Sequence, residues 1–143
     1  MRLLVAFDGS EGAQAALREA SALARECSAE TVVLRVLNTL IDAADVVAPS
    51  SDEAIAIVAK REEAEIAAAV AAAGLGAGAR VRVEISEHGE DVAETIVRVA
   101  EVEGATMIVI ASRRATSIAG TFLGSVAQHV LGDAPCPVLV VTK

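Results

Sequence analysis

The chain has 143 residues, the length of one ordinary domain, and we expect a single domain with one hydrophobic core over residues 1–143. Its formal net charge of −8 disfavours binding to nucleic-acid phosphates and to anionic membrane surfaces. The only aromatic residues, Phe7 and Phe122, offer no platform on which nucleic-acid bases could stack.

The chain carries no pattern typical of export or membrane insertion. Its N-terminal residues reach Asp8 before they form the apolar stretch of a signal peptide. The longest apolar run, 66–79, is shorter than the roughly 20 residues that a membrane span requires. The two cysteines, Cys27 and Cys136, are then expected to be reduced, small and buried. We therefore expect a cytoplasmic protein without membrane contacts.

The first elements follow a strand–helix–strand order. Residues 3–7 form a short apolar run that ends at a turn, which predicts a buried strand. Ser10 is placed to cap a helix that ends near residue 27. The β-branched residues in 31–37 predict a second strand, and 38–49 is expected to be a loop.

The middle of the chain predicts a long helix and an edge strand. Ser50 and Glu53 have the spacing of a capping box, and the Ala/Glu-rich helix that they open should end at the glycines that begin with Gly74. Residues 80–86 alternate polar and apolar side chains, which is typical of a strand with one covered side and one wet side. This third strand should lie at a sheet edge.

The last part of the chain repeats the alternation of helix and strand. Apolar spacing and acids in the first turn predict a helix over 90–102, followed by a buried strand at 107–111. Residues 112–121 are expected to be a loop, which leads to a helix that contains 124–131. The apolar residues 137–142 predict the last strand.

Alternating strands and helices predict an α/β fold, in which right-handed crossovers give a parallel sheet with helices on both faces. Ligands of such sheets bind beyond the C-terminal ends of the strands, where the winding direction reverses. This rule directs attention to Asp8 and to residues 111–125.

Several common catalytic and metal-binding patterns are missing from the sequence. The only lysines, Lys60 and Lys143, do not belong to a phosphate-binding Gly-Lys-Ser/Thr motif. No Gly-x-Ser-x-Gly elbow or Ser-His-Asp order is present, so no catalytic residue is predicted. His88 and His129 belong to different elements and have no Cys or carboxylate set at ligand spacing beside them, so no metal site is predicted.

Three stretches, 3–10, 104–110 and 111–141, resemble the universal stress protein family. The resemblance covers the whole chain. It implies a Rossmann-like, five-stranded parallel sheet in the order 3-2-1-4-5, similar to that of adenine nucleotide α-hydrolases. This order agrees with the edge position that the alternating third strand predicts.

The resemblance also suggests a phosphate-binding loop. ATP-binding members of the family carry Gly, two residues, Gly, nine residues, Gly and Ser or Thr, and the matching positions here are Ala111, Arg114, Gly124 and Ser125. Gly124 and Ser125 suit a helix N-terminus whose N–H groups and hydroxyl bind phosphate oxygens. Alternatively, Ser125 only caps this helix, with Gln128 as its capping-box partner.

The loop departs from the family pattern at two positions. Ala111 adds a methyl group, and Arg114 replaces a glycine by a residue that adopts left-handed backbone conformations at a cost and has a long side chain. Arg113 and Arg114 can instead pair with phosphate and replace lost backbone contacts. The resemblance places Asp8 near the ribose and Val36 beside the adenine, although Asp8 can also serve only as a turn-forming acid.

The resemblance therefore implies a stress-response domain that binds ATP or AMP, with Mg²⁺ if the ligand is ATP, at an altered site. A nucleotide-blind interaction module and a slow ATPase or autophosphorylating enzyme remain alternatives. The last strand is apolar on both faces and would be an exposed sheet edge, so we expect it to form a homodimer interface. The residues of this predicted interface are Val138, Leu139, Val140 and Val141.

Overall fold

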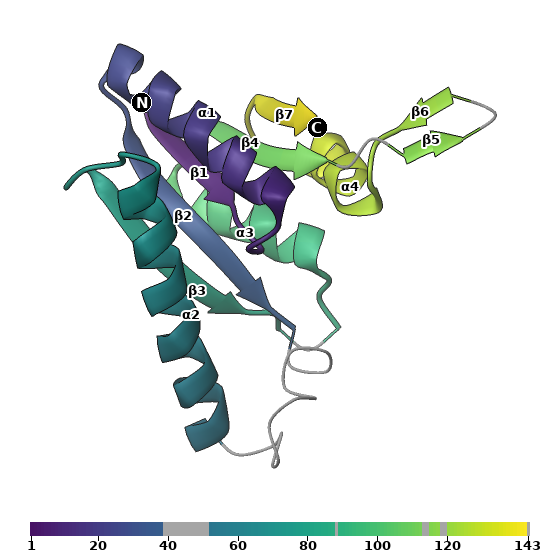
Figure 1. Cartoon of the computed structure of the whole chain (residues 1–143). Helices are drawn as coiled ribbons and strands as arrows, with labels where there is room; N and C mark the ends of the chain where they lie inside the picture. Colours follow the sequence, from purple (N-terminus) through teal and green to yellow (C-terminus); the bar gives the residue numbers. More distant parts are fainter. Residues whose placement is uncertain (39–51, 88, 113–114, 118–119, 143) are drawn as a thin grey trace.

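A computed structural model describes residues 1–38, 52–87, 89–112, 115–117 and 120–142 of the chain (Figure 1). Helices and strands alternate along most of it, as the sequence predicts. The elements are β1 Arg2–Ala6, α1 Glu11–Cys27, β2 Glu30–Leu37, α2 Asp52–Ala72, β3 Ala79–Ile85, α3 Val92–Glu103, β4 Met107–Ser112, β5 Ala115–Ser117, β6 Gly120–Phe122, α4 Ser125–Asp133 and β7 Val138–Thr142.

The main sheet has five parallel strands in the order β3-β2-β1-β4-β7. With β7 as its fifth strand, this is the predicted order 3-2-1-4-5, and the predicted fold class is confirmed. β1 lies at the centre, where Leu4 pairs with Val32 of β2 and Ile108 of β4. Leu3, Leu4 and Val5 are fully buried because helices cover both faces of a parallel sheet.

Two apolar layers lie on opposite faces of the sheet. Leu3 and Val5 point toward α1 and α2, where they pack with Leu17 and Ile66. Leu4 points to the other face, which is covered by α3 and α4 (Figure 1). The two-residue alternation of side chains along a strand thus divides one short apolar run between two cores.

The start of α1 has the predicted cap. Ser10 has an extended backbone, and its Oγ accepts a hydrogen bond from the N–H of Ala13 at 3.1 Å. Gly9 before it has a φ of +83°, a conformation that glycine adopts without steric cost. The turn after β1 is thereby fixed at the edge where ligands of this fold class bind.

β3 lies at a sheet edge as predicted, but ion pairs partly cover its polar side, although Arg80 stays exposed. Val81 and Val83 pack against the core under α1 and α2. On the opposite face, Arg82 reaches Glu103 of α3, whose carboxylate also accepts a hydrogen bond from Arg80. The alternation in the sequence therefore separates an apolar face from a face of ion pairs.

Three expectations need correction. Residues 112–121 are not simply a loop, because Ser112 ends β4 and the strands β5 and β6 form an antiparallel hairpin that projects from the main sheet (Figure 1). Cys27 is exposed at the end of α1, whereas Cys136 is half-buried against the core under α3 and α4, and both are free thiols. α3 begins at Val92, two residues after the predicted start at Glu90, because Asp91 is its N-cap.

Two further predictions fall wholly or partly on the rest of the chain. The predicted loop 38–49, apart from residue 38, and the predicted cap Ser50 lie outside the described residues, and α2 is described from Asp52. None of the helices described is both long and apolar enough to cross a membrane.

Candidate functional site

A cavity of about 170 Å³ opens at the C-terminal ends of β1, β2 and β4. The start of α1, the first turns of α3 and the first turn of α4 complete its wall. Three of the predicted site residues, Asp8, Val36 and Ala111, line this one cavity. The remaining lining residues are Ala6, Phe7, Ser10, Gly12, Ala13, Leu34, Arg35, Val92, Ile96, Ile110 and Val126.

The cavity is smaller than the roughly 300 to 1,000 Å³ of typical ligand pockets. It is also mainly apolar, with Val36, Ile96 and Ile110 among its walls. Such a space suits a flat, weakly polar group such as a nucleobase, and a charged extension of the ligand would have to lie outside it. The polar groups that could orient a ligand are at its rim.

Asp8 is the acid at this rim. Its Oδ1 accepts a hydrogen bond from the N–H of Ser10 at 2.9 Å, so the turn-forming role that the sequence suggested is present. Partial burial acts to raise the pKa of Asp8, but hydrogen bonds from Ser10 and the positive charge of Arg35 hold the pKa below its ordinary value. Asp8 is thus an anionic acceptor at neutral pH.

Arg35 was not singled out from the sequence. It lies on β2 between the cavity residues Leu34 and Val36, and its Nε is 3.1 Å from Glu62 Oε2 on α2. Both side chains are largely buried, so this ion pair fixes the guanidinium beside the cavity. An arginine inside a strand of apolar residues is the sequence feature that could have indicated it.

Ala111, at the end of β4, meets the start of α1. A Cβ added to Gly12 would lie only 3.2 Å from the Cβ of Ala111. The methyl group that distinguishes Ala111 from the family's glycine therefore fills space against Gly12. Both residues line the cavity, so their close approach forms part of its wall.

Ser112 links β4 to α4 and is a second residue that sequence reasoning missed. Its buried Oγ accepts a hydrogen bond from the N–H of Gly124 at 2.8 Å. This bond holds the N-terminus of α4 beside the end of β4. The sequence does show a serine after the predicted apolar strand 107–111. Its role could not be inferred, because its hydrogen-bond partner Gly124 belongs to a later segment.

Gly124 is the N-cap of α4, and Ser125 is its first helical residue. The alternative role predicted for Ser125, a capping box with Gln128, is wrong. The N-cap Gly124 makes no side-chain cap, and the Gln128 amide instead donates to the carbonyl of Leu123 at 2.7 Å. Among the described residues, no side chain accepts from the N–H groups of Ser125, Val126 and Ala127, and free N–H groups at a helix N-terminus are an arrangement that binds anions.

The structure does not bring all predicted residues to the cavity. Gly124 and Ser125 stand next to the lining residue Val126 but do not line the cavity themselves. Arg113 and Arg114 lie outside the described residues, and their roles stay predictions. The described part of the site is thus an apolar cavity with an acid at one rim and a helix N-terminus near another.

Sequence and structure comparisons agree on the relatives of this chain. The sequence model of the universal stress protein family matches residues 1–142. Universal stress protein MJ0531 of Methanocaldococcus jannaschii is 31% identical over 142 residues, which cover 99% of this chain and 82% of that protein.

Solved structures extend the likeness to the fold. A universal stress protein from Burkholderia pseudomallei is 32% identical, with a TM-score of 0.65, and the match covers 98% of this chain and 94% of that chain. The universal stress protein from Archaeoglobus fulgidus in complex with dAMP is 27% identical, with a TM-score of 0.66 and coverage of 99% and 97%. The chain therefore belongs to the universal stress protein family.

Proposed function

We propose that this protein binds an adenine nucleotide, AMP or ATP, at the cavity formed by the ends of β1, β2 and β4. The observation that carries the proposal is the convergence of Asp8, Val36 and Ala111, from three different strand ends, on one apolar cavity. The related protein from Archaeoglobus fulgidus that was solved with dAMP supports this choice of ligand.

The chemistry of the rim suggests how the nucleotide lies. The adenine packs beside Val36 in the apolar part of the cavity, where it is removed from water. The ribose hydroxyls donate to the Asp8 carboxylate, which still has acceptor capacity after the bond from Ser10. The phosphates lie outside the cavity toward Gly124 and Ser125, at the uncapped N-terminus of α4.

For ATP, Mg²⁺ would accompany the phosphates, as it does in most nucleotide sites. The described residues near the N-terminus of α4 offer the Ser125 hydroxyl as an oxygen ligand. The side chains of Arg113 and Arg114 would also bind the phosphates. Their cationic side chains would replace backbone contacts that the family's glycines allow.

The test begins with protein purified without added nucleotide. After acid denaturation, anion-exchange chromatography of the supernatant should show an adenine nucleotide. If the site is empty after purification, millimolar AMP or ATP should raise the melting temperature, because a ligand that binds only the folded state stabilises it. No released nucleotide together with no thermal shift would reject the proposal and leave the nucleotide-blind interaction module.

A further inference from the structure

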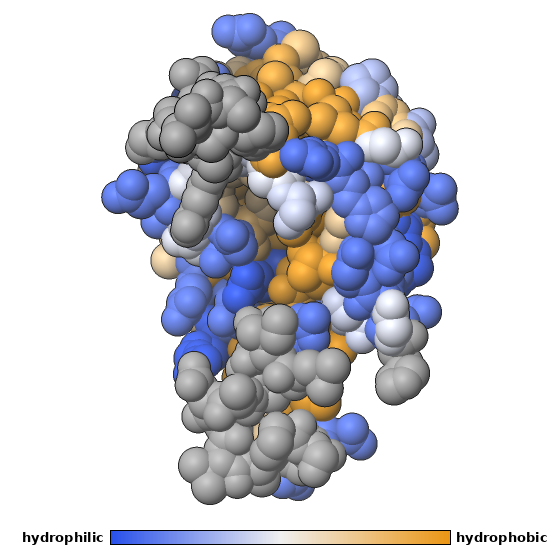
Figure 2. Space-filling view, turned by 90° about the vertical axis from the view of Figure 1, so that its right-hand side faces the viewer, coloured by the Kyte–Doolittle hydropathy of each residue, from blue (hydrophilic) through white to orange (hydrophobic). Residues whose placement is uncertain are grey.

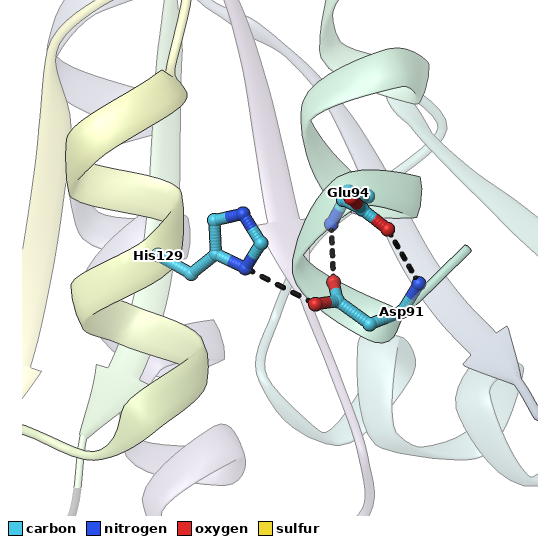
Figure 3. A group of neighbouring side chains, drawn as sticks. All are labelled: Asp91, Glu94 and His129. Atoms are coloured by element: carbon cyan, nitrogen blue, oxygen red, sulfur yellow. Dashed lines mark hydrogen bonds and ion pairs between the residues drawn. The ribbon is translucent and has the colours of Figure 1, made fainter. Parts of the chain in front are cut away.

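Outside the cavity, a histidine and two acids meet where α3 and α4 lie side by side (Figure 3), and a third acid lies next to the histidine on α4. Asp91 and Glu94 belong to the start of α3, and His129 and Asp133 to α4. Ligand atoms of Asp91, Glu94 and His129 all lie within 4.8 Å of one another. None of these four residues lines the nucleotide cavity. The sequence did not suggest this group because its members come from separate helices.

The two acids of α3 are held in place by the helix that they begin. Asp91 Oδ1 accepts the N–H of Glu94 at 2.8 Å, and Glu94 Oε2 accepts the N–H of Asp91 at 2.8 Å. This capping box uses one oxygen of each carboxylate. The second oxygen of Asp91 points to His129 (Figure 3). The acids are therefore oriented before any ligand arrives.

His129 has a carboxylate at each ring nitrogen. Its Nδ1 is 3.1 Å from Asp91 Oδ2, and its Nε2 is 3.0 Å from Asp133 Oδ2. A neutral imidazole has one N–H and one lone pair, so it can donate to only one of these acids. At the other nitrogen a lone pair would face an anionic oxygen. A cation at that nitrogen, either a second proton or a metal ion, removes the conflict.

We propose that Asp91, Glu94 and His129 bind a divalent cation of the zinc class. Asp133 accepts the Nε2–H of His129 and leaves Nδ1 as the metal ligand, which is the carboxylate–histidine arrangement common beside bound metals. Water completes the coordination, since His129 and Asp91 are both open to solvent. The ion ties α3 to α4.

The ligand atoms, one imidazole nitrogen and carboxylate oxygens, and the distance between Nδ1 and Oδ2 favour an ion of the zinc class over Mg²⁺ and Ca²⁺. Zinc accepts a mixture of imidazole nitrogen and carboxylate oxygen at about 2.0 to 2.2 Å, which places neighbouring ligands of a tetrahedron about 3.3 to 3.6 Å apart. The Nδ1 to Oδ2 distance of 3.1 Å needs only a small adjustment to reach that value. Mg²⁺ and Ca²⁺ prefer sites made of oxygen alone.

The experiment uses the full chain without an affinity tag and with Cys27→Ser, because the exposed thiol could also bind zinc. Calorimetric titration with ZnCl₂ at neutral pH should show one equivalent bound, and MgCl₂ at the same concentration should show none. His129→Gln should weaken zinc binding at least about 10-fold, and Asp133→Asn about 10-fold through the lost orientation of the ring. Zinc should also raise the melting temperature of the parent more than that of His129→Gln.

A matched control is Glu19→Gln, which removes an exposed acid on α1, the helix on the opposite face of the sheet. Its zinc affinity should equal that of the parent. Two results would overturn the proposal: equal zinc binding by the parent and His129→Gln, or no zinc binding by the parent.

Discussion

Gly12 and Ala111 show how a single methyl group can shape the site. The Cβ of Ala111 already occupies the space next to Gly12, and a second Cβ at 3.2 Å would be tighter than ordinary packing allows. Gly12 lies in the first turn of α1, where alanine would otherwise favour the helix. The two effects oppose each other, so the result of Gly12→Ala depends on residue 111.

A double-mutant cycle separates these effects. Gly12→Ala should be less favourable in the wild-type chain than in an Ala111→Gly background, with a coupling free energy of about 1 kcal/mol. Urea unfolding followed by circular dichroism measures all four proteins. Coupling near zero would mean that the backbone at the end of β4 yields without cost.

Glu103 carries the ion pairs between α3 and β3. It is buried, and its carboxylate oxygens accept hydrogen bonds from Arg80 and Arg82, each at 2.6 Å. Burial acts to raise the pKa of Glu103, yet the two arginines hold it below the ordinary value. These ion pairs, and not apolar packing, join α3 to the polar side of the edge strand β3.

Glu103→Gln should therefore destabilise the fold while preserving the side-chain shape. We expect a loss of about 1 to 3 kcal/mol, since the charges of two arginines lose their buried partner, although Arg80 can regain water. The control is Glu101→Gln, which changes an exposed acid of the same helix and should have little effect. Equal unfolding midpoints in urea for the two variants would contradict this role of Glu103.

Glu90 adds a pH dependence to the same face of the sheet. Hydrogen bonds from Arg98, opposed by burial and helped by the N–H of Glu87, lower its pKa from 4.5 to about 2. Since the folded state holds the proton less tightly than the unfolded state, the stabilisation is complete above pH 4.5 and is lost as the pH falls toward 2. This difference between the pKa of Glu90 in the unfolded and folded states corresponds to about 3 kcal/mol in the free energy of unfolding.

Exposure of Arg98 to water reduces that figure, and we expect Glu90 to contribute about 1 to 2 kcal/mol. The free energy of unfolding should drop more steeply between pH 5 and pH 3 in the wild type than in Glu90→Gln, with the two curves converging at the acidic end. Parallel curves across this range would show that the Arg98 pair does not stabilise the folded state.

The main helices and strands could be predicted because their apolar spacing and caps are local properties of the sequence. Ser10 caps α1 as expected, and the apolar run that contains Leu4 forms the central strand. The hairpin of β5 and β6 could not be predicted, because a three-residue strand is too short to show an alternation of apolar and polar residues. Likewise, the bond from Gly124 to Ser112 joins segments whose proximity only the folded sheet creates.

β7 is the terminal strand of the main sheet, and among the described residues no further strand pairs with it. Leu139 is 37% exposed, whereas Val138 and Val140 pack into the core under α3 and α4. Figure 2 shows apolar surface on the side of the molecule that carries β7 and α4. We propose, as the sequence predicts, that a second copy covers this edge and that the protein is a homodimer.

Leu139→Glu tests the dimer better than a change at Val140, which would place a charge in the core. Light scattering after size-exclusion chromatography should give about twice 14.5 kDa for the wild type and close to 14.5 kDa for Leu139→Glu. Ile57→Glu, a matched change at an exposed position of α2, should remain dimeric. A wild type that is monomeric at micromolar concentrations would rule out the β7 interface.

Calorimetric titration with AMP measures nucleotide binding at the cavity without any secondary readout. The wild type should bind one AMP per chain, and Asp8→Asn, which keeps the shape and the Ser10 bond but removes the charge, should weaken binding about 10- to 100-fold. Asp52→Asn, at the exposed start of α2, should bind like the wild type. If Asp8→Asn leaves the affinity for AMP unchanged, or if the wild type gives no heat of binding at millimolar AMP, the proposed nucleotide binding at this cavity is wrong.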